Sequence, residues 1–139
     1  LKLLDGIVDI YLPDFKYANS QMADKYSSNA DTYSEMTRLA LLEMNRQVGV
    51  AKPSADGLMH KGLMIRHLVM PGGVSGSLEA VRWIAASLPP ETYVNIMIQY
   101  RPAYLARQFP EINGHVSGEE YSRVVEEART LGLTNLDVE

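Results

Sequence analysis

Two short tracts place charged side chains where a buried strand would end. Asp14 and Lys16 follow the apolar run 7–12, and Arg66 lies inside the apolar run 63–69. A guanidinium can hold a carboxylate through two hydrogen bonds, and the ligands of parallel α/β proteins gather at the carboxyl ends of the strands. These three residues are therefore candidates for a ligand-binding site.

The same residues also fit a purely structural role. Asp14 and Lys16 are two positions apart, so their side chains share one face of an extended chain and can form an ion pair at the strand end. Arg66 needs a partner or water because an unpaired charge in an apolar strand is costly, and Asp14 is one such partner. His67 points to the opposite face, where a packing histidine in the helical layer is expected.

A third tract, residues 93–100, alternates between two kinds of side chain. One parity is apolar, and the other resembles the lining of a polar lumen and holds Asn95, Met97, Gln99 and Arg101. Gln99 and Arg101 join the candidate ligand-binding residues, whereas Met97 either packs against a planar ligand or fills space. His60 and His115 lie in predicted loops without a partner at metal-ligand spacing, so no metal site and no catalytic residue is predicted.

Strands and helices alternate along the chain. The predicted strands are 7–12, 63–69, 93–100 and 136–138, and the predicted helices are 20–26, a long one capped by Asp31 that ends at Gly49, 77–88 and 118–131. Ser117 with Glu120 forms a capping pattern for the last helix. Connections of a dozen residues or more require parallel pairing, so we expect one α/β domain, either a small open sheet or part of a barrel.

The composition excludes several classes of protein. The 139 residues carry 13 basic and 17 acidic side chains, a net charge of −4, without a basic patch for nucleic acid or an anchor for a membrane. There is no transmembrane stretch and no signal peptide, so a cytoplasmic protein is expected. The chain has no cysteine, which excludes disulfides and thiolate metal sites. It begins with Leu1 at the edge of a strand, and we expect further sequence upstream.

Three motifs in this order resemble consecutive strand ends of one enzyme family. They are Asp14-Phe15-Lys16, the tract Ile65 to Gly72 with its Pro-Gly ending, and Gln99-Tyr100-Arg101-Pro102. The chain resembles, over nearly its whole length, the later part of radical S-adenosylmethionine (SAM) proteins of the pyruvate formate-lyase activating enzyme type. The resemblance implies a partial (β/α) barrel of parallel strands with flanking helices, of which residues 1–139 form the carboxyl-terminal portion.

The resemblance also implies a cofactor and a chemistry. Asp14, Lys16 and Arg66 would line the SAM site, with Arg66 placed to meet the methionyl carboxylate, while Gln99 and Arg101 would face the lumen. The full-length parent would cleave SAM reductively at a [4Fe-4S] cluster and abstract hydrogen from an unknown substrate, in related enzymes a glycine of a partner protein.

One departure from the family changes what this chain can do. The three-cysteine loop that holds the cluster is absent, so this chain cannot bind the cluster and is expected to be inactive alone. Uncovered strand edges then predict self-association. The alternative is a stand-alone α/β binding or interaction module in which the same charges are structural ion pairs.

Overall fold

Four short strands form one parallel sheet in which the order in space is the order in the chain. The computed structural model describes residues 1–138. The sheet order is β1-β2-β3-β4 and all three pairings are parallel. The strands are β1 (Ile10–Tyr11), β2 (Gly62–Leu68), β3 (Tyr93–Met97) and β4 (Leu136–Val138). The predicted α/β class is therefore confirmed.

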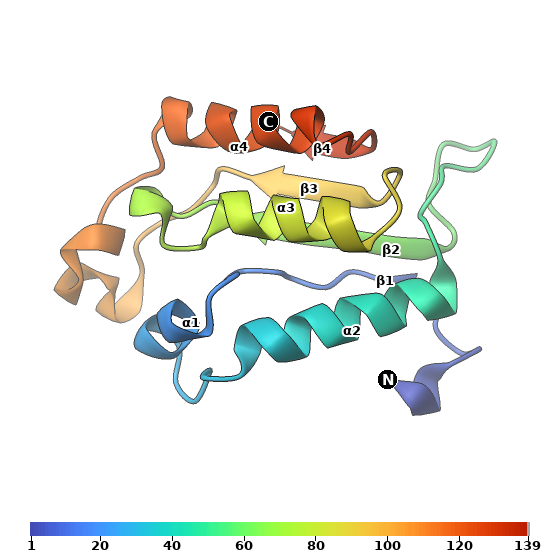
Figure 1. Ribbon diagram of the computed structural model, residues 1–139, viewed down its shortest axis with the longest axis horizontal. Coiled ribbons are helices and arrows are strands. Elements are labelled where there is room, and N and C mark those ends of the chain that lie inside the picture. Colours follow the sequence, from blue (N-terminus) through green and yellow to red (C-terminus); the bar gives the residue numbers. More distant parts are fainter. Residues whose placement is uncertain (139) are drawn as a thin grey trace.

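Helices connect each strand to the next. They are α1 (Ser20–Tyr26), α2 (Tyr33–Val48), α3 (Ser77–Ser87) and α4 (Gly118–Thr130), with 3-10 turns at Lys2–Leu4, Pro71–Gly73, Tyr104–Gln108 and Pro110–Ile112. Figure 1 shows α2, α3 and α4 lying side by side over one face of the sheet, as expected for consecutive parallel crossovers. The arrangement is that of a partial β/α fold, and within residues 1–138 the sheet is open, with β1 and β4 as its edges.

The core lies between the sheet and this helical layer. Leu63 and Ile65 of β2 and Val94 and Ile96 of β3 are completely buried, whereas the side chains that alternate with them, such as Arg66 and Asn95, are partly exposed. This alternation follows from the pleat, because successive side chains point to opposite faces. Burying each such side chain stabilises the fold by about 1.5–3 kcal/mol, so the helix-facing set holds the sheet against the helices.

Two predicted strands are longer than the observed ones. The predicted strand 7–12 pairs with β2 only over Ile10–Tyr11, because the amides of Ile7 and Val8 donate instead to the carbonyl of Leu4 in the preceding turn. The predicted strand 93–100 ends at Met97, and β4 pairs with it only as far as Ile96. The first and third strands of the sheet are therefore shorter than predicted, and both belong to tracts that carry candidate site residues.

The long helix differs from expectation in its cap and its buried face. It starts after Thr32, which makes no side-chain capping hydrogen bond, so the predicted cap at Asp31 is wrong. Its buried residues are Ser34, Leu41 and Val48, spaced by seven, whereas the apolar side chains of Met36, Leu39 and Leu42 are exposed. The helix packs on the sheet along this narrow line of buried residues, so the other apolar side chains of the helix stay in contact with solvent.

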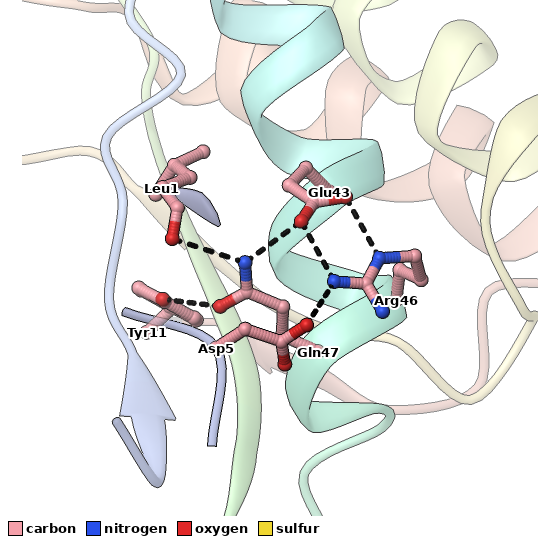
Figure 2. A network of polar contacts seen from close by, with 6 residues as sticks. All are labelled: Leu1, Asp5, Tyr11, Glu43, Arg46 and Gln47. Atoms are coloured by element: carbon pink, nitrogen blue, oxygen red, sulfur yellow. Dashed lines mark hydrogen bonds and ion pairs between the residues drawn. The ribbon is translucent and has the colours of Figure 1, made fainter. Parts of the chain in front are cut away.

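A polar network fastens the start of the chain to the end of α2 (Figure 2). Gln47 is its centre: its amide nitrogen donates to the carbonyl of Leu1 at 3.2 Å and to Glu43 at 2.8 Å, and its amide oxygen accepts from the Tyr11 hydroxyl at 2.6 Å. Arg46 bridges Glu43 and Asp5. The hydrogen bonds from Arg46 and then Gln47 lower the pKa of Glu43 to about 2. The network is structural, because its members satisfy one another.

Candidate ligand-binding site

The candidate site begins where the chain runs on beyond β1 alongside β2. The amide of Phe15 donates to the carbonyl of Arg66 at 2.8 Å, and the amide of Arg66 donates to the carbonyl of Pro13 at 2.9 Å. These bonds make Asp14 and Arg66 partners in an isolated parallel bridge. Their side chains therefore leave the sheet together, on the face that α2, α3 and α4 do not cover.

The Asp14 carboxylate lies between two cations. Its Oδ1 accepts from Arg66 Nε at 2.8 Å and lies 2.7 Å from Arg66 Nη2, and its Oδ2 lies 3.1 Å from Lys16 Nζ. The three side chains are 27%, 42% and 46% exposed for Asp14, Arg66 and Lys16 respectively. One negative and two positive charges leave the cluster with a net charge of about +1, and its cations keep donors directed to solvent.

The backbone of this segment is held by a residue that sequence reasoning did not identify. The hydroxyl of Tyr33, at the start of α2, donates to the carbonyl of Asp14 at 3.1 Å and accepts from the amide of Lys16 at 2.9 Å. No spacing in the sequence signals this contact, because Tyr33 lies in another element. Tyr33 orients the Asp14–Lys16 segment relative to α2.

A polar row continues from Arg66 across the sheet. Arg66 is paired in register with Asn95, and Asn95 with Asp137, a residue that no sequence pattern had singled out. Asn95 Nδ2 and the Tyr93 hydroxyl donate to Asp137 Oδ2 at 2.8 and 2.7 Å. Burial first, and then Asp137, raises the pKa of Tyr93 to about 12. The predicted polar face of the third strand is thus confirmed for Asn95, and it points the same way as Arg66.

Gln99 and Arg101 are not brought into this row. Because β3 ends at Met97, Gln99 lies beyond the strand that was predicted to carry it, and Arg101 follows in the loop, where it was predicted. Gln99 is exposed and makes no polar contact among the described residues, and Arg101 lines a separate hollow together with Tyr17 and Met70. The placement of Gln99 and Arg101 on a common strand face with Asn95 is therefore wrong.

His67 occupies the opposite, helix-facing side, as predicted. It is fully buried; its Nδ1 donates to the carbonyl of Phe15 at 2.5 Å, so its Nε2 accepts from the Ser77 hydroxyl at 2.8 Å. Ser75 Oγ lies 2.7 Å from Ser77 Oγ and accepts from the amide of Met70. Burial lowers the pKa of His67 to about 4. This closed chain of hydrogen bonds fixes the segment after β2 and gives His67 a structural role.

The other histidines do not form a metal centre. His60 is exposed and lies 2.7 Å from Asp56, and His115 is exposed in the loop before α4. Across residues 1–138, no group of three or more His, Cys, Asp or Glu side chains is arranged to hold a metal ion. In the same part of the chain, no helix has both the length and the apolar character needed to cross a membrane.

Comparisons with known proteins find one informative similarity. No protein-family model matches the chain, and no solved structure matches it. The uncharacterized protein MJ0674 of Methanocaldococcus jannaschii is 31% identical over 133 residues, which are 96% of this chain and 35% of that relative. The chain therefore spans about a third of the length of the curated relative that it matches.

Proposed function

We propose that this chain is the carboxyl-terminal part of a radical SAM enzyme that resembles pyruvate formate-lyase activating enzyme, and that Asp14, Lys16 and Arg66 bind SAM. The observation that carries the proposal is the cluster of these three side chains on the uncovered face of the sheet, beside the end of β2. In parallel α/β folds this is the end where ligands bind.

The charges of the cluster suit the amino-acid end of SAM. Two nitrogens of the Arg66 guanidinium contact one oxygen of Asp14, and its other N–H donors can bind a carboxylate. Lys16 adds a second cation. Asp14 offers a carboxylate to an ammonium group. In this role the residues of the chain bind and orient SAM, and Tyr33 keeps the segment that carries Asp14 and Lys16 in place.

An iron-sulfur cluster does not fit the residues of this chain. There is no cysteine among the 139 residues, and the described residues form no other metal-binding group. Reductive cleavage of SAM, and hydrogen abstraction from a substrate, would therefore belong to the full-length protein and need ligands from outside this chain. A glycine of a partner protein is one substrate that the resemblance suggests. The cytoplasmic location predicted from the sequence stays part of the proposal.

A second candidate is a stand-alone binding or interaction module in which the charges are structural. The direct Asp14–Arg66 pair favours it, because the two groups already satisfy part of each other's hydrogen bonding. Exposed pairs of this kind contribute about 0–1 kcal/mol to stability. A structural pair therefore predicts a small loss of stability on removal and no loss of ligand binding.

The test uses the full-length gene product, purified without oxygen and supplied with a reductant and SAM. We expect bound iron and sulfide, and formation of 5'-deoxyadenosine that falls at least tenfold in Arg66→Gln because a charge-assisted contact is worth about 1.5–3 kcal/mol. Arg107→Gln, which changes an exposed arginine away from the cluster, is the matched control and should keep the wild-type rate.

One result would decide against the enzyme, and another would decide against Arg66 as part of its SAM site. One is a gene that encodes no three-cysteine motif upstream of Leu1 together with a product that binds no iron. The other is equal 5'-deoxyadenosine formation by wild type and Arg66→Gln, which would leave the family proposal standing but remove Arg66 from the site.

A further inference from the structure

A hollow lies at the same end of the sheet as the Asp14–Lys16–Arg66 cluster, and residues that follow three of the strands line it. Its lining includes Tyr17, which follows β1, Met70, which follows β2, and Arg101, which follows β3. The volume is about 520 Å³, within the range of about 300–1,000 Å³ that small-molecule sites occupy. Figure 1 shows α1 and the loop after β3 at the end toward which the β3 arrow points.

Aromatic rings make up much of the wall. The rings of Tyr26 and Phe109 meet edge to face with centroids 5.4 Å apart and an interplanar angle of 82°. Tyr104 is 92% exposed and has a positive φ of 51°, a conformation that an aromatic residue rarely adopts. A planar molecule can stack on such rings at little entropic cost. The strained Tyr104 stands at the rim, with its ring available to a ligand.

Two polar groups of the hollow lack partners within residues 1–138. Tyr17 is 7% exposed, yet its hydroxyl makes no hydrogen bond there, whereas the hydroxyls of Tyr26 and Tyr100 donate to Glu111 and to the carbonyl of Ile112. Arg101 is exposed and forms no ion pair with a described residue. The Tyr17 hydroxyl oxygen is not sealed from solvent, so it is free to donate to a ligand oxygen in the hollow.

The remaining charges do not neutralise Arg101. Lys25 and Tyr26 both bind Glu111, so that carboxylate is occupied, and the hydrogen bond from Lys25 is the main cause that lowers its pKa to about 2. Asp24 also borders the hollow but accepts from the amide of Ala30. The hollow thus combines stacking surfaces, one free guanidinium and one free phenol, which is the donor set for an oxyanion.

We propose that this hollow binds a planar aromatic molecule that carries an oxyanion, either a carboxylate or a phosphate. The ring system stacks against the aromatic wall, and the oxyanion accepts hydrogen bonds from Arg101 and from the Tyr17 hydroxyl. This site is distinct from the Asp14–Lys16–Arg66 cluster and does not depend on the function proposed for that cluster.

Titration calorimetry with the wild-type protein and three probes tests the proposal. The probes are 2-naphthoate, 2-naphthyl phosphate and the neutral 2-naphthamide. We expect at least one anion to bind with a stoichiometry of one and about tenfold or more tightly than the amide, and the preferred anion identifies the carboxylate or the phosphate class. Arg101→Gln should abolish this preference, and Tyr17→Phe should weaken it by several fold.

Controls separate this site from the other one and from general binding. Arg107→Gln removes a neighbouring exposed arginine that does not line the hollow, and Arg66→Gln changes the first cluster; both should bind the anion as wild type does. The proposal is overturned if neither anion binds more tightly than the amide, or if Arg101→Gln keeps the full preference for the anion.

Discussion

At the scale of single residues, the role of each charged side chain depends on which residues it contacts in the fold. Asp14, Lys16 and Arg66 were identified from their types and their places beside apolar runs, and the structure brings them into contact. Arg101 was also selected, but it lies in the aromatic hollow, because the strand predicted to run to residue 100 ends at Met97. Tyr33 and Asp137 had no sequence signal, since each acts through a contact distant in the chain.

His67 should make folding stability depend on pH. Its pKa is lowered from 6.5 to about 4 in the folded protein. Above pH 6.5 the imidazole is neutral in both states; as the pH falls from 6.5 toward 4 the unfolded chain binds a proton that the folded chain does not, so stability falls and then levels off. We expect a loss of roughly 2 kcal/mol between pH 7.5 and pH 5, measured by urea unfolding.

Variants separate this contribution from those of other groups. His67→Gln should be less stable at pH 7.5, by about 1–3 kcal/mol for the buried hydrogen bonds, and should lose most of the decline between pH 7.5 and 5. His115→Gln, which changes an exposed histidine, should behave as wild type. A decline that persists unchanged in His67→Gln would show that another group causes it.

At the scale of elements, the type of each helix and strand could be predicted better than the residues at which it begins and ends. Each predicted helix and strand is present, because apolar periodicity and capping residues are local properties. The ends of β1 and β3 could not be predicted, since they depend on where a neighbouring strand stops offering partners. The need for glycine at position 62 could not be predicted either. A Cβ at Gly62 would lie 2.3 Å from the backbone of Ala51, and this contact joins two separate segments of the chain.

The capping box of α4 should contribute measurably to stability. Ser117 accepts from the amide of Glu120 at 3.1 Å, and Glu120 accepts from the amide of Ser117 and, through its other oxygen, from the amide of Gly72. Ser117→Ala should therefore lower the free energy of unfolding by about 1 kcal/mol, as measured by urea denaturation.

A matched serine in the same helix provides the control. Ser122 is exposed in the interior of α4, and Ser122→Ala should be neutral or slightly stabilising because alanine is the better helix former. If the two substitutions have the same effect, the cap makes no special contribution to the helix.

At the scale of the whole molecule, the helices cover one face of the sheet and leave the other uncovered (Figure 1). The uncovered face carries the polar row from Asp14 through Arg66 and Asn95 to Asp137, and apolar residues of the edge strand lie beside it. Parallel sheets are usually buried on both faces, so this face is where further protein or ligand would bind. The polar row on this face could not be predicted from the sequence, because it depends on the registers in which all four strands pair.

The uncovered edge should make the chain self-associate. Ile10 and Leu12 are 39% and 51% exposed on the edge strand β1 and its extension, and Leu39 of the adjacent α2 is 55% exposed. Light scattering should give a mass that rises with protein concentration, and Ile10→Lys together with Leu12→Lys should reduce it. Leu58→Lys, in an exposed loop, is the control. A monomeric mass at every concentration would contradict the prediction.

The most direct test of the central claim is equilibrium binding of SAM to the full-length protein by titration calorimetry. If Asp14, Lys16 and Arg66 hold the amino-acid end of SAM, wild type binds it, Arg66→Gln binds it at least tenfold more weakly, and Arg107→Gln is unchanged. Equal affinity of the wild type and Arg66→Gln, or no binding by the wild type, would contradict the account and leave the cluster as a structural ion pair.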